Sequence, residues 1–209
     1  MITDKETLKF YLDADRFALG KSRKRPRFFS DEIWKFEILL RKCEYYTNTK
    51  DHHPLRYLLT RLRLHKISVK LGYDIPVNVL GPGMKINHRG TIIVNANCRI
   101  GKWCDMHPGV CIGDNPTIDE SGGKIHQAPT IGDFVFLGPG AKLFGSIHIG
   151  NNVKVGANSV VNKNVESGMV VFGNPMVTQH SSHNVATSAS QDFEDAFLKS
   201  FPQYQKFLI

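Results

Sequence analysis

Aliphatic residues recur at every sixth position through the middle of the chain. One series consists of Ile131, Leu137, Leu143, Ile149, Val155 and Val161. Leu80 and Ile86, and then Val94, Ile100, Met106 and Ile112, show the same spacing earlier in the chain. A glycine directly follows many of these positions, as at Gly81, Gly101, Gly113, Gly132, Gly138, Gly150 and Gly156. An amphipathic α-helix repeats about every 3.6 residues and a strand every two, so neither explains a period of six.

A period of six fits a triangular parallel β-helix, in which three short strands complete each turn. The aliphatic residue points inward, and the small residue after it helps the chain to turn the corner. Glycine at this frequency would cost an α-helix about 1 kcal/mol per residue, which argues against a helix here. The sequence therefore predicts a β-helix of hexapeptide repeats over residues 73–177.

The register of the hexads is interrupted twice. Eight residues separate Ile86 from Val94, and the two extra residues follow the segment NHRG at positions 87–90. Nineteen residues separate Ile112 from Ile131, and the segment between them is rich in Gly, Pro and Asp. Such a composition predicts a loop expelled from the coil. Loops on a rigid scaffold are common places for binding sites.

Residues 1–72 are predicted to form a short α-helical N-terminal region. A first helix is expected near residues 4–17, and a second after Ser30 as its N-cap. A third helix is expected to begin at Pro54 and to stop at Gly72. Its apolar stripe is interpreted as packing surface and consists of Leu55, Leu58, Leu59 and Leu62.

The C-terminal tail, residues 178–209, is predicted to be a polar linker followed by a short helix. The linker corresponds to HSSHNVATSASQ and the amphipathic helix to DFEDAFLKSFPQYQKFLI. The pattern leaves open whether this helix packs on a neighbour or is mobile.

The net charge of +8 suits an anionic partner, and the densest basic run is KSRKRPR at residues 21–27. A solvated loop is the simpler interpretation of this run, and contact with a membrane surface or another polyanion is the alternative. No nucleic-acid partner is predicted. No segment approaches the roughly 18 apolar residues that span a bilayer, so no integral membrane segment is expected.

The N-terminal residues MITDKETLKF are charged and contain no apolar run, so no secretory signal is expected. Cys43, Cys98, Cys104 and Cys111 show no CxxC spacing. Reduced thiols and a cytoplasmic location are therefore expected.

Several segments carry a family resemblance and lie in a fixed order between residues 72 and 176. They read GPGMKINHRGTIIV, HPGVCIG, SGGK, PTIGDFVFLGPGAKLFGSIHIGNNVKVGANSVVNKNV and VVFGNP. Together they resemble the serine acetyltransferase branch of the hexapeptide-repeat acyltransferases. They resemble more closely still the serine acetyltransferase-like proteins of bacterial polysaccharide clusters. The N-terminal region is similar only in being helical, and it is much shorter than the helical domain of true serine acetyltransferases.

The resemblance implies a left-handed β-helix that transfers an acetyl group from acetyl-CoA to a hydroxyl. It also implies a homotrimer with active sites between subunits. His88, in INHRG, corresponds to the catalytic histidine of the family. An imidazole with a pKa of about 6.5 can accept the proton of a hydroxyl that attacks a thioester. A lone histidine is more often structural, but the motif and the neighbouring break in register favour catalysis.

The family orients this histidine with an aspartate, which corresponds to Asp74 in DIPV. This chain is one residue shorter between the two positions, and an exposed turn residue is an equal alternative. For CoA, the resemblance indicates Pro139 in LGPGA and Ala157 in VGANS, along a groove between coils.

Other residues correspond to the CoA contacts outside this groove. Gly122, Gly123 and Lys124 resemble the loop that covers the pantetheine arm. Lys163 is placed to meet a phosphate, with an ordinary solvated lysine as the alternative.

Two departures from the family affect the acceptor. Asn87 replaces an acidic residue before the histidine, and Gln127-Ala128-Pro129 replaces an Arg-His-Pro segment that helps to bind serine. A buried polar substrate group without its partner costs about 1–3 kcal/mol. With Asn87 and Gln127 as acceptor contacts, the sequence predicts a sugar hydroxyl of a surface-polysaccharide precursor. The alternative is a serine O-acetyltransferase of cysteine biosynthesis.

Two other classes of function are alternatives on this fold. Hexapeptide-repeat carbonic anhydrases bind zinc through histidines, and His88, His107 and His126 are spaced nineteen apart. Their differing places in the hexads argue against a common metal, so no metal is predicted. A non-enzymatic scaffold is the other alternative, and His88 in its motif with the expelled Gly/Lys loop argues against it.

Overall fold

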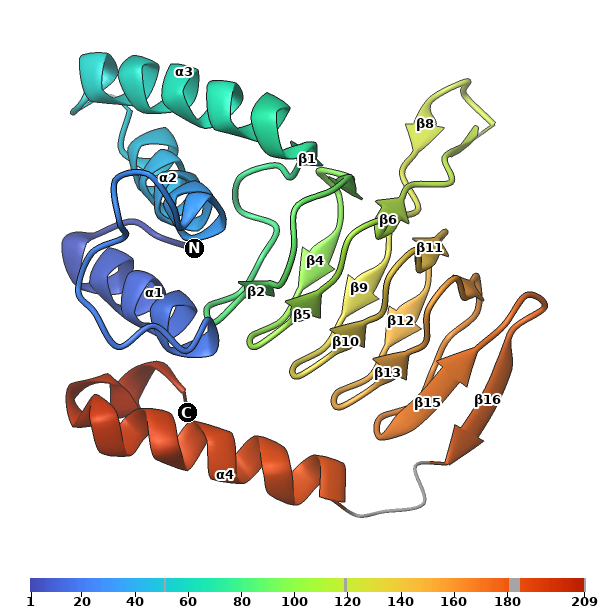
Figure 1. The fold of residues 1–209 in the computed structure, drawn as a ribbon. Helices are drawn as coiled ribbons and strands as arrows, with labels where there is room; N and C mark the ends of the chain where they lie inside the picture. The colour runs from blue at the N-terminus through green and yellow to red at the C-terminus, as the bar shows by residue number, and fades with distance from the viewer. Residues whose placement is uncertain (51, 119, 181–184, 209) are drawn as a thin grey trace.

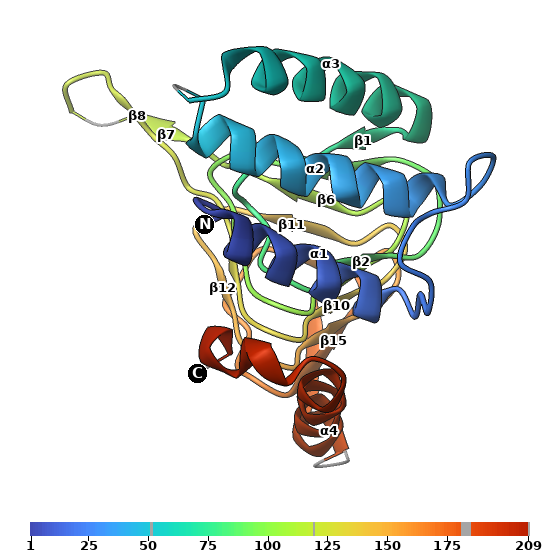
Figure 2. The same cartoon turned by 90° about the vertical axis from the view of Figure 1, so that its left-hand side faces the viewer.

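The computed structural model describes the chain except for residues 51, 119, 181–184 and 209. It begins with α1 (Lys5–Ala18), α2 (Glu32–Asn48) and α3 (Pro54–Leu71), continues as a coil of short strands, and ends with α4 (Val185–Ser200) and η1 (Pro202–Phe207) (Figure 1). Viewed from the helical end, the coil lies behind α1 and α2 (Figure 2). None of the helices in the described residues has both the length and the apolar character needed to cross a membrane.

The coil strands that the structure describes form three sheets. Sheet 1 consists of β1 (Tyr73–Asp74), β3 (Ile92–Val94), β6 (Cys111–Gly113), β11 (Lys142–Phe144) and β14 (Val160–Val161). Sheet 2 consists of β2 (Lys85–Ile86), β5 (Asp105–Met106), β10 (Phe136–Leu137), β13 (Lys154–Val155), β15 (Met169–Phe172) and β16 (Val177–His180). Sheet 3 consists of β4 (Arg99–Ile100), β9 (Thr130–Ile131) and β12 (His148–Ile149). From β2 onward the coil visits sheets 2, 1 and 3 in turn, and the strands paired within these three sheets are parallel except for β15 with β16. This is the parallel coil of hexapeptide repeats that the period of six predicts.

The hexad residues form the core of the coil. Those of sheet 2 pair in register as Ile86, Met106, Leu137 and Val155, and those of sheet 1 as Val94, Ile112, Leu143 and Val161. Each of these side chains is at most 3% exposed. The predicted inward orientation is therefore confirmed.

A second set of inward residues lies two positions before the hexad residues. It consists of Met84, Ile92, Cys98, Cys104, Val110, Pro129, Val135, Ala141, Ile147, Val153 and Ser159, and all of them are buried. Burial raises the pKa of the Cys98 thiol to about 11 and raises that of Cys104 further. Because only a thiolate is a good nucleophile, these two cysteines are inert core residues at neutral pH.

The two interruptions of the register have different structures. Ile86 and its partner Met106 are twenty residues apart, whereas Val94 and its partner Ile112 are eighteen apart, so the first coil absorbs two extra residues around His88. The second interruption leaves the coil as an antiparallel hairpin of β7 (Thr117–Ile118) and β8 (Lys124–Ile125). Figure 1 shows this hairpin projecting from the side of the coil. The predicted expelled loop is confirmed.

The ends of the N-terminal helices agree with the sequence at three points and differ at one. α1 begins after Asp4, and α3 has Pro54 in its first turn and stops at Gly72, whose φ of 79° a glycine adopts readily. The N-cap of α2 is Asp31, so the prediction of Ser30 is wrong. The Asp31 carboxylate accepts hydrogen bonds from the Arg27 amide and the Lys21 ammonium, which hold this residue at the helix start.

The leucine stripe of α3 is not packing surface within this chain. Leu55, Leu58, Leu59 and Leu62 are exposed, and the prediction is wrong for them. α3 is apolar on both sides, and it packs through Thr60, Leu64, Ile67 and Leu71 instead. The hydrophobic pattern alone does not show which of two apolar sides faces the protein.

The C-terminal segment contains more regular structure than expected. The predicted polar linker lies partly in β16 and partly in α4, which begins at Val185. The prediction of a linker is therefore wrong for these residues. Residues 181–184 of the predicted linker lie outside the described part of the chain. The tail packs on the same chain, where Phe10 of α1 and Trp103 of the coil join Phe197 and Tyr204 in one aromatic cluster. Hydrogen bonds of 2.8 Å from Trp103 to Glu194 and from Tyr204 to Asp13 fix its position.

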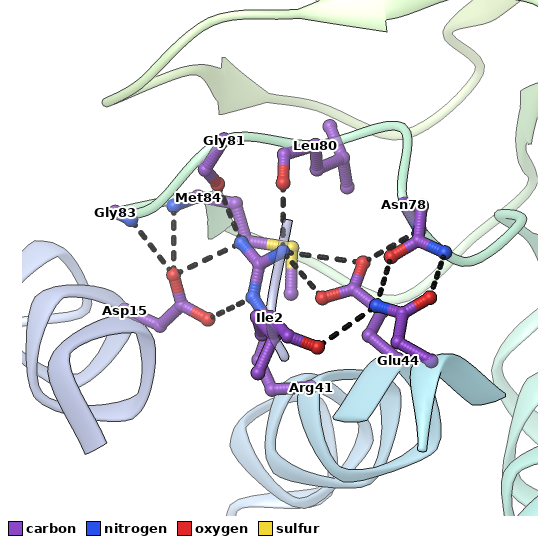
Figure 3. Close-up of polar contacts among 10 residues, drawn as sticks. Ile2, Asp15, Arg41, Glu44, Asn78, Leu80, Gly81, Gly83 and Met84 are labelled. Atoms are coloured by element: carbon purple, nitrogen blue, oxygen red, sulfur yellow. Dashed lines mark hydrogen bonds and ion pairs between the residues drawn. The ribbon is translucent and has the colours of Figure 1, made fainter. Parts of the chain in front are cut away.

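A buried ion cluster joins the helices to the first coil (Figure 3). The Arg41 guanidinium of α2 pairs with Asp15 and Glu44 at 2.7 and 3.1 Å. It also donates to the backbone oxygens of Leu80 and Gly81 at 2.8 and 2.5 Å. An open coil edge would leave backbone groups unpaired. The cluster satisfies several of them and closes this end of the coil.

Candidate active site

His88 stands at one corner of the coil, where the chain passes from sheet 2 to sheet 1. It lies two residues after Ile86, and Pro108, Pro139 and Ala157 have the same place after the hexad residues below it. Backbone hydrogen bonds of 2.9 Å from Gly140 to Pro108 and 2.8 Å from Asn158 to Pro139 stack successive corners. The fold therefore aligns His88 with two of the predicted CoA contacts, Pro139 and Ala157, along one edge.

The imidazole of His88 is exposed and its backbone is held in place. The Tyr73 hydroxyl donates a 2.9 Å hydrogen bond to the His88 carbonyl oxygen. Burial raises the pKa of this phenol, and the nearby Glu37 carboxyl raises it further. Tyr73 therefore remains a neutral donor that positions the His88 main chain and leaves its ring free to meet a ligand.

A polar cluster lies beside His88 on the outer side of sheet 2. The Asn87 amide donates to Asp105 and approaches Nε2 of His107 at 3.1 Å, and Lys85 pairs with Asp105 at 2.9 Å. Oδ1 of Asp105 also lies 3.6 Å from Nε2 of His107, so Asn87, Asp105 and His107 meet at one point. The His88 and His107 rings have centroids 6.1 Å apart.

Sequence reasoning did not assign Lys85, Asp105 or His107 to the site. The strand register contains this relation. Lys85 pairs with Asp105 on the next coil, and Asn87 and His107 are the next outward-facing residues of the same two coils. A cleft with a volume of about 270 Å³ adjoins this cluster. Lys85, Asn87 and Arg89 line it together with Asp31, Glu32 and Trp34 at the start of α2.

Asp74 lies on β1, exposed, in register with Ile93 of sheet 1. It lines a different cleft, of about 590 Å³, between sheet 1 and Arg61, His65 and Ser68 of α3. Among the residues that the structure describes, no hydrogen bond or ion pair joins Asp74 to His88. The predicted pairing of these two side chains therefore stays a prediction.

The remaining predicted CoA contacts lie at the next corner, after sheet 1. Gly122, Gly123 and Lys124 are on the β7–β8 hairpin, which leaves the coil there, and Lys163 is exposed two residues after Val161 of β14. Gly122 has a φ of 83° with open space around its α-carbon, so backbone conformation rather than packing requires glycine. Sheet 1 separates this corner from the corner of His88 within one chain.

Gln127 lies at the base of the hairpin. Its backbone N–H donates to the Asp114 carboxylate at 2.6 Å, and its side-chain NH₂ donates to the Thr117 hydroxyl at 3.0 Å. The ring of His126 also binds Asp114, and this hydrogen bond is the main cause that lowers the pKa of the Asp114 carboxyl. Gln127 and Asn87 therefore occupy different corners of one chain.

The histidines of the zinc alternative are not brought together. His88 and His107 are neighbours, but His126 lies on the hairpin and binds Asp114. The described residues contain no group of three or more His, Cys, Asp or Glu side chains arranged to hold a metal ion.

Comparison with known proteins agrees with the repeat pattern. Residues 128–163 match the family described as bacterial transferase hexapeptide (six repeats). The chain is 35% identical over 119 residues to a serine acetyltransferase of Synechococcus elongatus, which is 56% of this chain and 47% of that protein. The chain spans about half the length of the curated relatives that it matches.

Solved structures resemble the chain over most of its length. The soybean serine acetyltransferase apoenzyme superimposes with a TM-score of 0.66 at 25% identity, covering 84% of this chain and 70% of that one. A serine acetyltransferase in complex with CoA superimposes with a TM-score of 0.64 at 22% identity, over 84% of this chain and 70% of that one. The fold of most of this chain is thus shared with these proteins.

Proposed function

We propose that this protein is an acetyl-CoA-dependent O-acetyltransferase with a left-handed β-helix, and that His88 is its general base. The observation that carries the proposal is the coil register, which aligns exposed His88 with Pro139 and Ala157 along one edge. The resemblance to serine acetyltransferases, one of them solved with CoA, supports acetyl-CoA as the donor.

The proposed reaction is a direct transfer. Nε2 or Nδ1 of His88 accepts the proton of the acceptor hydroxyl while the hydroxyl oxygen attacks the thioester carbonyl. The carbon–sulfur bond of the tetrahedral intermediate then breaks, and the protonated imidazole returns its proton to the departing CoA thiolate. Holding both substrates together supplies much of the rate, and a backbone N–H of the coil is the proposed donor to the oxyanion.

The division of the CoA contacts between two corners supports a homotrimer. His88, Pro139 and Ala157 share the corner after sheet 2, whereas the hairpin glycines, Lys124 and Lys163 share the corner after sheet 1. A threefold arrangement would bring the first corner of one subunit against the second corner of the next. In the proposed site, one edge therefore carries the base and the neighbouring subunit covers the CoA arm. Asp74 remains a proposed partner of His88 in this assembly.

Serine is the acceptor that the comparisons favour, because the relatives are named serine acetyltransferases. Two features of the site support it. Asn87 stands where the related family has an acidic residue, and the neighbouring Asp105 supplies a carboxylate close to that position. Lys85 supplies a cation. The adjoining cleft of about 270 Å³ lies below the usual range of about 300–1,000 Å³ for larger ligands.

A sugar hydroxyl of a polysaccharide precursor is the second candidate. The neutral Asn87 favours it, since its amide is already bonded to Asp105 and His107 and offers no charge to an amino acid. The side-chain NH₂ of Gln127 likewise already donates a hydrogen bond to Thr117. The comparisons give this acceptor less support than serine.

Release of CoA thiol from acetyl-CoA tests the proposal. We expect serine to accelerate release by the wild type, and His88→Ala to lower the turnover number about 10²–10⁴-fold with the melting temperature unchanged. Nucleotide sugars and oligosaccharides serve as competing acceptors. Acceleration by a sugar but not by serine would select the second acceptor, and unimpaired turnover by the His88 variant would refute the mechanism.

A further inference from the structure

α3 presents a stripe of large apolar side chains to solvent. Leu55, Leu58, Leu59, Leu62 and Val69 are 67%, 51%, 44%, 57% and 70% exposed. Residues three and four apart share one face of a helix, so the four leucines form a continuous stripe opposite the buried line of Leu64 and Leu71. Val69 lies on the same face beyond Lys66. α3 is the uppermost helix in both views, at the outer limit of the helical region (Figures 1 and 2). Scattered exposed leucines are ordinary, but a contiguous stripe indicates a contact surface.

Cations surround this stripe. α3 contains Arg56, Arg61, Arg63, Lys66 and Lys70 and no Asp or Glu. Arg56, Arg63 and Lys70 are seven residues apart and therefore run along one flank of the leucines. In the described part of the chain, Lys70 pairs with Glu32 at 2.6 Å, whereas Arg56, Arg63 and Lys66 form no ion pair. The flank carries uncompensated positive charge.

The basic run at residues 21–27 continues this surface. It is followed by Phe28 and Phe29, which are 85% and 92% exposed. Within the described residues, Asp31 pairs with Lys21 and Arg23, and the other cations of the run form no ion pair. α2 begins shortly after this run with Glu32, whose pairing with Lys70 places the end of the run near the C-terminal end of α3. Figure 2 shows the segment between α1 and α2 projecting from the molecule near this end.

The charge of this surface decides between its possible occupants. A second copy would cover the leucines, but it would bring two uncompensated cationic flanks together, which opposes association. The interface of an anionic bilayer receives apolar side chains at the acyl boundary and attracts Lys and Arg to its headgroups. Aromatic residues next to basic ones suit the same boundary. We propose that the outer face of α3 and the segment 21–29 dock this protein onto an anionic lipid surface.

Vesicle co-sedimentation tests this proposal. The wild-type protein is mixed with vesicles of phosphatidylcholine containing phosphatidylglycerol, and separately with vesicles of phosphatidylcholine alone. We expect binding to the anionic vesicles only, weakened by added salt. Leu58→Ser with Leu62→Ser, and separately Arg56→Glu with Arg63→Glu, should each lower the partition coefficient about tenfold or more. Lys9→Glu with Lys199→Glu makes the same change of charge on exposed residues of α1 and α4, and it should leave binding intact.

The design separates docking from folding, assembly and catalysis. The substituted residues are exposed, so circular dichroism, the mass in solution and thiol release should match the wild type in every variant. Failure of the wild type to bind anionic vesicles would overturn the proposal, as would equal loss in the Lys9/Lys199 control. A reduced mass in solution for the Leu58/Leu62 variant would show that a second copy occupies the face, and would also overturn it.

Discussion

Replacing Arg41 by Met removes the cation of the buried cluster that joins α1 and α2 to the first coil (Figure 3). The guanidinium has five N–H donors. Nε and Nη2 reach the two oxygens of Asp15, Nη1 reaches Glu44 and the Leu80 carbonyl, and Nη2 also reaches the Gly81 carbonyl. Met fills a similar volume but restores none of these bonds.

The expected loss of stability follows from the burial of the cluster. The side chains of Arg41, Asp15 and Glu44 are 0%, 3% and 2% exposed. Removing one partner from a buried pair costs about 3–5 kcal/mol, because the remaining charge is left without compensation. The exposed pair of Lys206 with Glu6, whose side chains are 60% and 58% exposed, provides the control. Lys206→Met should cost about 1 kcal/mol or less.

The pH dependence of the Arg41→Met deficit has a definite sign. Burial already raises the pKa of Asp15 in the wild type, and the attraction of Arg41 opposes that rise. Without Arg41 the pKa rises further. When the pKa of a carboxyl is raised in the folded state, the protein loses stability as the pH rises above the ordinary pKa of that carboxyl. The deficit of the variant should therefore grow from acidic to neutral pH.

Urea unfolding at a fixed protein concentration measures these differences through Trp34 and Trp103, the two tryptophans of the chain. Adding Asp15→Asn and Glu44→Gln to Arg41→Met removes the stranded charges and should restore part of the lost stability. A loss below about 1 kcal/mol for Arg41→Met, equal to that of the Lys206 control, would refute the reasoning. So would a deficit that shrinks as pH rises.

Three further predictions follow from single residues. Burial and the nearby Asp15 raise the pKa of Glu37 well above its usual range, so the folded protein keeps a proton that the unfolded chain releases. Glu37→Gln should therefore be as stable as the wild type at pH about 5 and more stable at pH about 8. Unfolding midpoints that are equal for the two proteins at both pH values would contradict this. Leu137→Ala should lower the free energy of unfolding by about 2–5 kcal/mol in urea, against less than about 0.5 kcal/mol for the exposed Val177→Ala. Gly122→Ala should raise the KM for acetyl-CoA with little change in the melting temperature, because the substitution strains an exposed hairpin turn with φ of 83°, where the added Cβ would meet no atom within 4 Å. An unchanged KM would remove this turn from the proposed CoA site.

The sequence predicted those parts of the fold that repeat locally. One inward aliphatic residue per strand is the geometric requirement of a three-sided coil, so Leu137, Leu143 and Ile149 could be assigned without any partner in view. The second inward position was missed because its residues range from large aliphatic Ile92 to small Ala141 and polar Ser159, and such a mixed set gives no regular hydropathy pattern. Contacts between distant segments were also missed: Tyr204 meets Asp13 across most of the chain.

The candidate site illustrates the same limit in chemical terms. His88 could be identified because its motif and the two-residue insertion lie together in the sequence. His107 and Asp105 enter the site through stacking of one coil on the next, and that neighbour relation appears only once the register is known. The hexad positions contain this register, so counting outward residues from each inward one would have placed Lys85 beside Asp105.

The α3 leucines follow a different physical rule from the hexads. Inside the coil, an apolar residue has one possible environment, because the closed triangle leaves a single interior. A helix with apolar residues on opposite sides has two, and its own chain covers only the side of Leu64 and Leu71. The uncovered side carries cations along its flank, so the partner that completes it must be both apolar and anionic. A folding core satisfies only the first of these conditions, and an anionic lipid surface satisfies both.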